Sequence, residues 1–275
     1  PGERLMVPIS QLPAIIALAK QAGQAILREY DQAGEDVIFK PGGSPLTRAD
    51  MASHHLILAG LQALTPALPV LSEESAALPY DERRHWRAYW LVDPLDGTKE
   101  FLKRNGEFTV NIAFVEQGEP VLGVIYAPAL DLTYFASRSE GAFRQSPDGN
   151  PVAIAVQNHR DAKLKVVASR SHLGNGLEGG LERLGEHEYV KMGSSLKFCA
   201  VADGTAHLYI RRGPTMEWDT AAGQCIVEAA GGMVTDLQGK TLSYNKPNLL
   251  NPAFLATSIP YVWQQLLKEE IIHIT

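Results

Sequence analysis

The stretch Asp93-Pro94-Leu95-Asp96-Gly97-Thr98 decides how we interpret this chain, and it follows an apolar run over residues 89–92. That run predicts a buried strand that ends at the first aspartate. Residues three apart on an extended strand face opposite sides, but the proline and the glycine favour a turn that brings both carboxylates to one point. Two carboxylates with a backbone carbonyl between them are the oxygen ligands that hard cations prefer. The stretch therefore indicates a cation site at the end of a strand.

The end of the same stretch indicates an anion site beside the cation. The N–H groups of Gly97 and Thr98 would open a helix over residues 98–103, and helix N-termini bind anions. A simpler alternative is an ordinary Asx-type turn in which Thr98 only caps this helix. A short motif taken alone leaves both interpretations open.

Further carboxylates stand at the ends of other predicted elements. Glu73 and Glu74 follow a predicted strand over residues 69–71, and Asp219 precedes a predicted helix over residues 220–230. Each has a simple explanation, because acidic pairs are commonly exposed in turns and an aspartate before a helix can be its N-cap. Together with the two aspartates of the motif, however, they occupy strand ends and helix starts, where α/β folds place their sites.

The apolar patterns predict two unlike halves. A helix is expected over residues 12–30, and a second one runs from a Thr47 cap to about residue 64 with Asp50 in its first turn. Residues 108–143 favour antiparallel hairpins. After about residue 155, strands over 164–168, 189–191 and 206–210 alternate with helices near 176–184, 195–202, 220–230 and 261–270. We therefore predict an α+β half over residues 6–155 and an α/β half over residues 156–275.

Composition excludes several classes of function. The 275 residues include 31 Asp and Glu against 25 Lys and Arg, a net charge of -6, which argues against a nucleic-acid partner. Apolar runs fall short of the roughly 20 residues that cross a bilayer, and the N-terminus has no secretion signal. We expect a cytoplasmic protein, with peripheral association at the inner membrane as an open alternative. Cys199 and Cys225 are expected to be buried thiols.

Other short motifs have simpler explanations. Residues 174–179 fit G-x-G-x-x-G but lack the surrounding strand–helix–strand unit, and Gly239-Lys240-Thr241 lacks the upstream glycine of a phosphate loop, so it indicates a turn. His54 and His55 are expected on a helix face, because no His-x-x-x-His pair supports a zinc site.

Three blocks in order resemble the lithium-sensitive phosphatase superfamily of inositol monophosphatases. They are residues 71–75 (LSEES), 90–101 (WLVDPLDGTKEF) and 213–223 (GPTMEWDTAAG). Lys99-Glu100-Phe101, together with residues 193–199 (GSSLKFC), resembles the CysQ-type 3'(2'),5'-bisphosphate nucleotidases within it, because inositol phosphatases usually have Thr-Asn-Phe. The resemblance implies an αβαβα sandwich with the site between its halves and two or three Mg²⁺ ions.

The resemblance also implies a role for each acidic residue. Glu73, Asp93 and the Leu95 carbonyl would hold one ion, while Asp93, Asp96 and Asp219 would hold the second. Asp50 and Thr98 would orient and deprotonate the attacking water, with the N–H groups of Gly97 and Thr98 on the phosphate. Gly42 replaces the acidic residue of the family loop, which puts a third ion in question. The expected substrate contacts are Glu73, Leu95, Asp96, Gly97, Thr98, Ser194, Ser195, Lys197, Arg211 and Asp219, and residues 169–172 are expected to flank an adenine.

We therefore expect a Mg²⁺-dependent phosphatase that removes the 3'-phosphate of adenosine 3',5'-bisphosphate, giving AMP and phosphate, as a housekeeping step of sulfur assimilation. An inositol or sugar monophosphatase with the same metals is the nearest alternative. A catalytically silent metal-binding regulator is a further one, against which the water-activating pair argues. The substrate would be a small nucleotide, and the protein a monomer or a homodimer.

Overall fold

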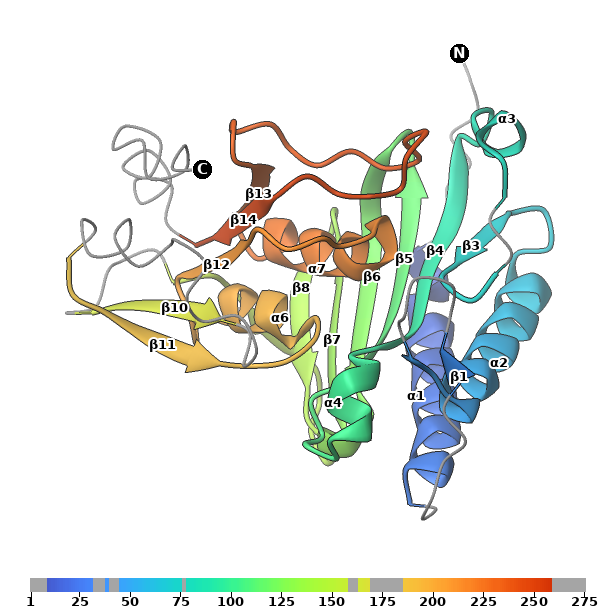
Figure 1. Cartoon of the computed structure of the whole chain (residues 1–275), viewed down its shortest axis with the longest axis horizontal. Coiled ribbons are helices and arrows are strands. Elements are labelled where there is room, and N and C mark those ends of the chain that lie inside the picture. Colours follow the sequence, from blue (N-terminus) through green and yellow to red (C-terminus); the bar gives the residue numbers. More distant parts are fainter. Residues whose placement is uncertain are drawn as a thin grey trace.

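The protein is built of stacked layers of helix and sheet (Figure 1). The computed structural model describes residues 9–31, 38–39, 45–75, 78–157, 163–168 and 185–258. Within these ranges a helical pair, a seven-stranded sheet, a second helical pair and a five-stranded sheet follow one another. The mixed α/β class predicted from the sequence is confirmed. The final helical layer of the expected αβαβα sandwich would need residues 176–184 and 261–270, which lie outside the described residues.

The seven-stranded sheet carries the N-terminal half. Its strands lie in chain order, β3 pairs with β4 in parallel, and the later pairs are antiparallel, which confirms the hairpins predicted for residues 108–143. The strands are β3 (Val70–Ser72), β4 (Ala88–Asp96), β5 (Thr109–Glu116), β6 (Glu119–Ala127), β7 (Leu132–Ser137), β8 (Gly141–Gln145) and β9 (Val152–Ile154), with the short helix α3 (Tyr80–Arg83) between β3 and β4 and the 3-10 turn η2 (Pro128–Leu130) between β6 and β7.

Strand β4 is longer than the sequence predicted. We expected it to end at Asp93, but it continues to Asp96, and its pairing with β5 shifts between these two residues. The reason is Pro94, which has no N–H to donate to the ladder and is tolerated in a strand at a bulge. The bulge therefore takes the place of the expected strand end.

Two helices cover one face of this sheet. They are α1 (Leu12–Tyr30), which follows the turn η1 (Ile9–Gln11), and α2 (Arg48–Leu64), and both agree with the predicted helices. The strands β1 (Ile38–Phe39) and β2 (Pro45–Leu46) pair just before α2. Trp90 on β4 is fully buried in the core that α1 and α2 share with the sheet, and its Nε1 donates to Thr65 Oγ1 at 2.8 Å. Truncating such a buried aromatic side chain costs about 3–5 kcal/mol.

The helix α7 (Glu217–Ala229) lies on the other face of the seven-stranded sheet, and α6 (Leu196–Ala202) lies between α7 and the five-stranded sheet (Figure 1). Gly223 allows this close approach, because a Cβ there would overlap the ring of Phe198 on α6. The second sheet has the order β11 (His187–Lys191), β10 (Leu164–Ala168), β12 (Leu208–Arg211), β14 (Phe254–Thr257) and β13 (Met233–Asp236). Of these, β13 and β14 escaped the sequence analysis.

Several smaller expectations also have an outcome. Cys199 and Cys225 are both buried thiols, as predicted. Gly239 lies in the turn after β13. No helix in the described part of the chain combines the length and the apolar character that crossing a membrane requires. The division at residues 155 and 156 stays a prediction.

Candidate active site

The predicted site residues come from four element ends that the fold brings to one place. Asp50 stands in the first turn of α2, Glu73 just after β3, the Asp93–Asp96 bulge at the end of β4, and Asp219 in the first turn of α7. The short helix α4 (Thr98–Leu102) continues directly from the bulge. Residues far apart in the sequence thus share one region between the two sheets.

The start of α2 holds Asp50 through a local cap. Thr47 is the N-cap, as predicted, and both its N–H and its hydroxyl donate to Asp50 Oδ2, at 2.8 and 2.6 Å. The other carboxylate oxygen, Oδ1, accepts the Thr98 hydroxyl at 3.3 Å. Asp50 is 1% exposed. The structure therefore brings together the pair that was expected to activate water.

The bulge in β4 fixes the direction of Asp93. The Leu95 N–H donates to Asp93 Oδ1 at 3.1 Å, and Ser53 on α2 donates its hydroxyl to the Pro94 carbonyl at 2.6 Å. Asp93 is 1% exposed, so its carboxylate lies deep in the site. The first bond holds the carboxylate within the bulge, and the second ties the bulge to the helix that carries Asp50.

Gly97 turns the chain from β4 into α4. Its φ is +89°, a left-handed conformation that favours glycine, and a Cβ would overlap the Ser194 hydroxyl. That hydroxyl donates to the carbonyls of Asp96 and Glu107, both at 2.8 Å. The turn in the motif is thus fixed by contact with the C-terminal half of the chain.

Three carboxylates form a cluster that fits a cation. One oxygen each of Glu73, Asp93 and Asp219 lie within 4.8 Å of one another. Burial, followed by the charge of Glu73, raises the pKa of Asp93 well above its usual range, and burial followed by Asp96 raises the pKa of Asp219 to about 7. Like charges held this close favour neutralisation by a cation or a proton. All the side-chain donors of the cluster are hard oxygens, which suit Mg²⁺, Ca²⁺ or Mn²⁺.

Asp219 is not the N-cap of its helix, although the sequence had allowed that role. Helix α7 begins earlier than predicted, with Met216 as the N-cap and Asp219 in the third helical position. Its Oδ2 accepts the Met216 N–H at 2.7 Å. The reason for the earlier start is a neighbouring loop that holds residues 215–217, described below.

Asp96 stands next to the cluster rather than inside it. Its Oδ2 accepts the Ser195 hydroxyl, which in turn accepts a hydrogen bond from the Asn111 amide. Ser194 and Ser195 were expected to bind an anion, but their hydroxyl groups donate hydrogen bonds to Asp96 and to the Glu107 carbonyl. They line the site and shape its wall, while their contact with substrate stays a prediction.

A pocket of about 190 Å³ opens beside the acidic cluster, and its lining includes Asp96, Gly97 and Asp219. The cations Lys99, Lys197 and Arg211 and the aromatic residues Phe198, Tyr209 and Phe254 line it elsewhere. Lys197 is a buried cation and not a solvated surface one, because the residue is only 6% exposed. Its ammonium lies 5.5 Å from the centre of the Tyr209 ring.

Two opposing effects act on the pKa of Lys197. Burial lowers the pKa of the ammonium, and the nearby Asp96 carboxylate opposes that shift. Arg211 lies on the same pocket, where its Nε donates to the Gly213 carbonyl at 3.3 Å. The pocket wall thus combines carboxylates with cationic side chains, and the cations suit an anionic group of a substrate.

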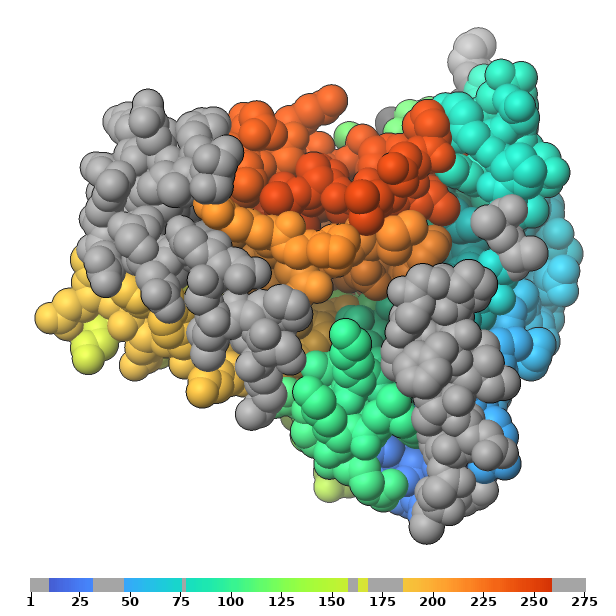
Figure 2. Space-filling view, viewed as in Figure 1, coloured from blue at the N-terminus to red at the C-terminus, as the bar shows by residue number. Residues whose placement is uncertain are grey.

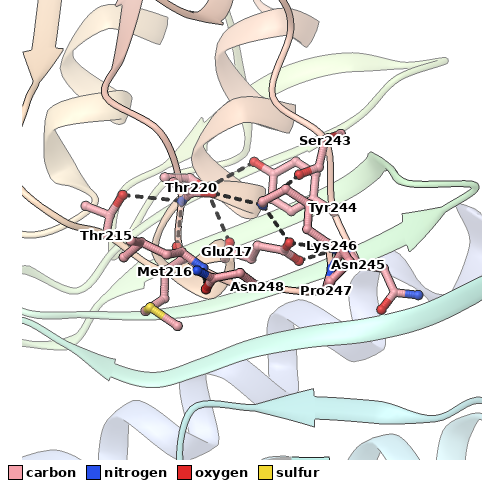
Figure 3. A network of polar contacts seen from close by, with 12 residues as sticks. Thr215, Met216, Glu217, Thr220, Ser243, Tyr244, Asn245, Lys246, Pro247 and Asn248 are labelled. Atoms are coloured by element: carbon pink, nitrogen blue, oxygen red, sulfur yellow. Dashed lines mark hydrogen bonds and ion pairs between the residues drawn. The ribbon is translucent and has the colours of Figure 1, made fainter. Parts of the chain in front are cut away.

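Some residues of the site were missed or fall outside the described residues. Glu100 lines the pocket, although its sequence block had served only as a family marker. Glu217 and Lys246 belong to a polar network (Figure 3). Arg83 donates to the same loop, and no local pattern signals these contacts. Gly42 and residues 169–172 lie outside the described residues.

The fold and the site define the class of protein, a layered α/β phosphatase with an acidic cluster that fits a metal ion. The chain belongs to the inositol monophosphatase family, whose model matches residues 10–274, and enzymes of this family depend on metal ions.

Relatives of known name are similar over most of this length. The 3'(2'),5'-bisphosphate nucleotidase CysQ of Salmonella typhimurium is 52% identical over 248 residues, 90% of this chain and 99% of that protein. CysQ of Escherichia coli K12 is 50% identical, covering 88% and 98%. The crystal structure of CysQ from Bacteroides thetaiotaomicron has a TM-score of 0.79 at 42% identity, over 93% of this chain and 99% of that one. An IMPase of Thermotoga maritima has a TM-score of 0.76 at 25% identity, over 96% of each.

Proposed function

We propose that the protein is a Mg²⁺-dependent 3'(2'),5'-bisphosphate nucleotidase that cleaves the 3'-phosphate from adenosine 3',5'-bisphosphate, giving AMP and phosphate. The observation that carries the proposal is the pocket that joins the acidic cluster to the buried cation Lys197. Relatives named as bisphosphate nucleotidases at about 50% identity support it.

The acidic residues would hold two or three Mg²⁺ ions. Glu73, Asp93 and the Leu95 carbonyl are proposed for one site, and Asp93, Asp96 and Asp219 for the other. When bound, such ions supply charge neutralisation for the transferred phosphoryl group. Positioning and charge neutralisation account for nearly all the catalysis that phosphoryl transfer needs.

Asp50 and Thr98 would act on the attacking water. The Thr98 hydroxyl already donates to Asp50 Oδ1, so it can accept a proton from the water while passing its own to that carboxylate. The cap bonds from Thr47 occupy Oδ2 and keep Oδ1 directed at Thr98. The N–H groups of Gly97 and Thr98 are proposed to contact the phosphate that is cleaved.

Lys197 and Arg211 are proposed to bind the second phosphate. An inositol or sugar monophosphate has no second phosphate for the buried ammonium of Lys197 to bind. This difference separates the proposed activity from the nearest alternative, and it gives the substrate test its form. A cytoplasmic location and a monomer or homodimer stay predictions.

A phosphate-release assay on paired substrates tests the proposal. We expect Lys197→Ala to raise KM for adenosine 3',5'-bisphosphate more than about tenfold, with little change in the hydrolysis of a monophosphate that lacks the second group. Lys99→Ala is a control, because Lys99 lines the same pocket but is not proposed to bind the second phosphate. Equal losses on both substrates would assign Lys197 to the fold or to the reacting phosphate. A wild-type preference for inositol monophosphate would support the alternative.

A further inference from the structure

A buried carboxylate that belongs to none of the proposed catalytic roles lies at the start of α7. Glu217 is 0% exposed and accepts three hydrogen bonds from one loop (Figure 3). Its Oε2 accepts the Asn245 N–H at 2.7 Å, while its Oε1 accepts the Lys246 N–H at 3.0 Å and the Lys246 ammonium at 2.6 Å. Hydrogen bonds to an ionised acceptor are the stronger kind. Glu217 therefore fixes the path of the loop over residues 243–251.

The same loop holds the first turn of α7. The Leu249 carbonyl accepts the Glu217 N–H at 3.0 Å, and the Asn251 N–H donates to the Thr215 carbonyl at 2.8 Å. The Asn251 amide also donates to the Met216 carbonyl at 2.8 Å. Met216 is the residue whose N–H binds Asp219 Oδ2, so the position of the loop determines the position of that carboxylate.

Arg83 connects this loop to the N-terminal half. It is 2% exposed, and its guanidinium donates to Asn245 Oδ1 at 2.9 Å, to the Lys246 carbonyl at 2.7 Å and to the Pro247 carbonyl at 2.9 Å. Arg83 ends α3, which lies between Glu73 and β4 in the chain. In Figure 2 the red atoms of the loop touch the cyan atoms of this region. The network thus joins the loop that positions Asp219 to the segment of chain that follows Glu73.

We infer that Glu217 is a positioning residue for the metal site, acting through the loop over residues 243–251 to hold Asp219 opposite Glu73 and Asp93. It is not itself placed as a ligand, because residues two apart on a helix do not face the same side and its oxygens already accept three donors. The inference rests on the metal-binding part of the proposed function and does not depend on which phosphate ester is cleaved.

The test measures metal binding directly, by calorimetric titration of the full chain with MgCl₂ alone. Glu217→Gln keeps the shape but replaces one acceptor oxygen with an NH₂ group, which must face a donor in either orientation. We expect Mg²⁺ affinity to fall about tenfold or more, with KM for the substrate unchanged at saturating Mg²⁺. Glu228→Gln is the matched control, a part-buried carboxylate on the same helix that bonds Gln224 and not the loop, and it should bind Mg²⁺ like the wild type.

The variant Lys246→Met distinguishes a positioning role of Glu217 from a purely electrostatic effect on Mg²⁺ affinity. It also tests the inference if Glu217→Gln does not fold. Removing a positive charge near a cation site would strengthen Mg²⁺ binding if only through-space electrostatics mattered. Positioning predicts the opposite, a loss of about threefold or more, because one of the three bonds to Glu217 disappears. Wild-type affinity in Glu217→Gln, tighter binding in Lys246→Met, or an equal loss in Glu228→Gln would each overturn the inference. Altered Mg²⁺ binding in a protein without nucleotidase activity would overturn the proposed substrate alone.

Discussion

The starts of α2 and α7 use the same device in two different ways. Each places an aspartate in the third helical position, where one carboxylate oxygen accepts the N–H of the N-cap, at 2.8 Å for Asp50 and 2.7 Å for Asp219. At α2 the cap is local, because the Thr47 hydroxyl takes part. At α7 the N-cap is Met216, and a loop some 30 residues further along the chain holds the turn instead. A helix start can thus orient a carboxylate either through its own cap residue or through contacts with a distant loop.

The two starts also differ in the task of the other carboxylate oxygen. Asp50 directs Oδ1 at the Thr98 hydroxyl, whereas Asp219 belongs to the acidic cluster with Glu73 and Asp93. The locally held aspartate therefore stands where we propose that a proton is transferred. The aspartate held by distant contacts belongs to the cluster that we propose for the cation, where small shifts between segments would change how well the cation fits.

Asp219→Asn should have the largest effect on turnover. The asparagine oxygen can still accept the Met216 N–H, so the helix start is kept while the cluster loses a negative charge. We expect kcat/KM to fall more than about 100-fold, or about 2.7 kcal/mol, and Asp93→Asn should behave alike. Retention of more than about a tenth of the wild-type value by either variant would contradict a ligand role. A thermal melt confirms that the variants are folded.

Asp50→Ala should reduce turnover by about 100-fold but leave Mg²⁺ affinity within about threefold of the wild type. The reason is that Asp50 bonds Thr98 and the Thr47 cap, whereas Glu73, Asp93 and Asp219 form the acidic cluster. Stability should fall by about 1 kcal/mol through loss of the cap. Thr47→Ala is the control, since it weakens the cap and keeps the carboxylate. If Asp50→Ala lost metal affinity together with rate, Asp50 would be a ligand and the contrast between the two helix starts would disappear.

The smallest effect should appear as a pH dependence of stability without metal. The folded protein raises the pKa of Asp219 from 3.8 to about 7, so the protonated form is favoured in the fold. The stability this gives is fully present below the ordinary pKa and is lost as the pH rises through about 7. With EDTA, Tm should be lower at pH 8 than at pH 5.5 by about 2 °C or more, and Mg²⁺ should raise Tm most at pH 8.

Asp219→Asn in EDTA provides the comparison for this last effect. It removes a charge that repels its neighbours, so its Tm at pH 8 should equal or exceed that of the wild type. A metal-free wild type that is more stable at pH 8 than at pH 5.5 would mean that the cluster is not strained by like charges.

The contrast between the two helix starts also explains what the sequence could predict. Thr47 followed by Asp50 is a local cap pattern, so the helix, its N-cap and the place of Asp50 in the first turn were all predicted. The hairpins of β5 to β8 were predicted for the same reason, because their apolar alternation and turns lie within a few residues. The family resemblance added the ligand positions around Asp93, which fold locally at the bulge in β4.

Long-range partners explain the errors and omissions. Asp219 was given an N-cap alternative because its helix start depends on Asn251, 35 residues beyond Met216. Glu217 received no role, since its partners lie 28 and 29 residues away. The burial of Lys197 follows from α6 packing between α7 and the second sheet, which no pattern within seven helical residues encodes.

The glycine at position 223 has a consequence for enzyme engineering. Its missing side chain lets Phe198 of α6 sit directly against α7, and Phe198 is the neighbour of Lys197 in the chain. A single methyl group there would push the α6 backbone away from α7 and carry the ammonium with it. With the proposed role of Lys197 in binding the second phosphate, a substitution at residue 223 would alter substrate selectivity, so libraries aimed at new phosphate esters should include residue 223 as well as the pocket wall.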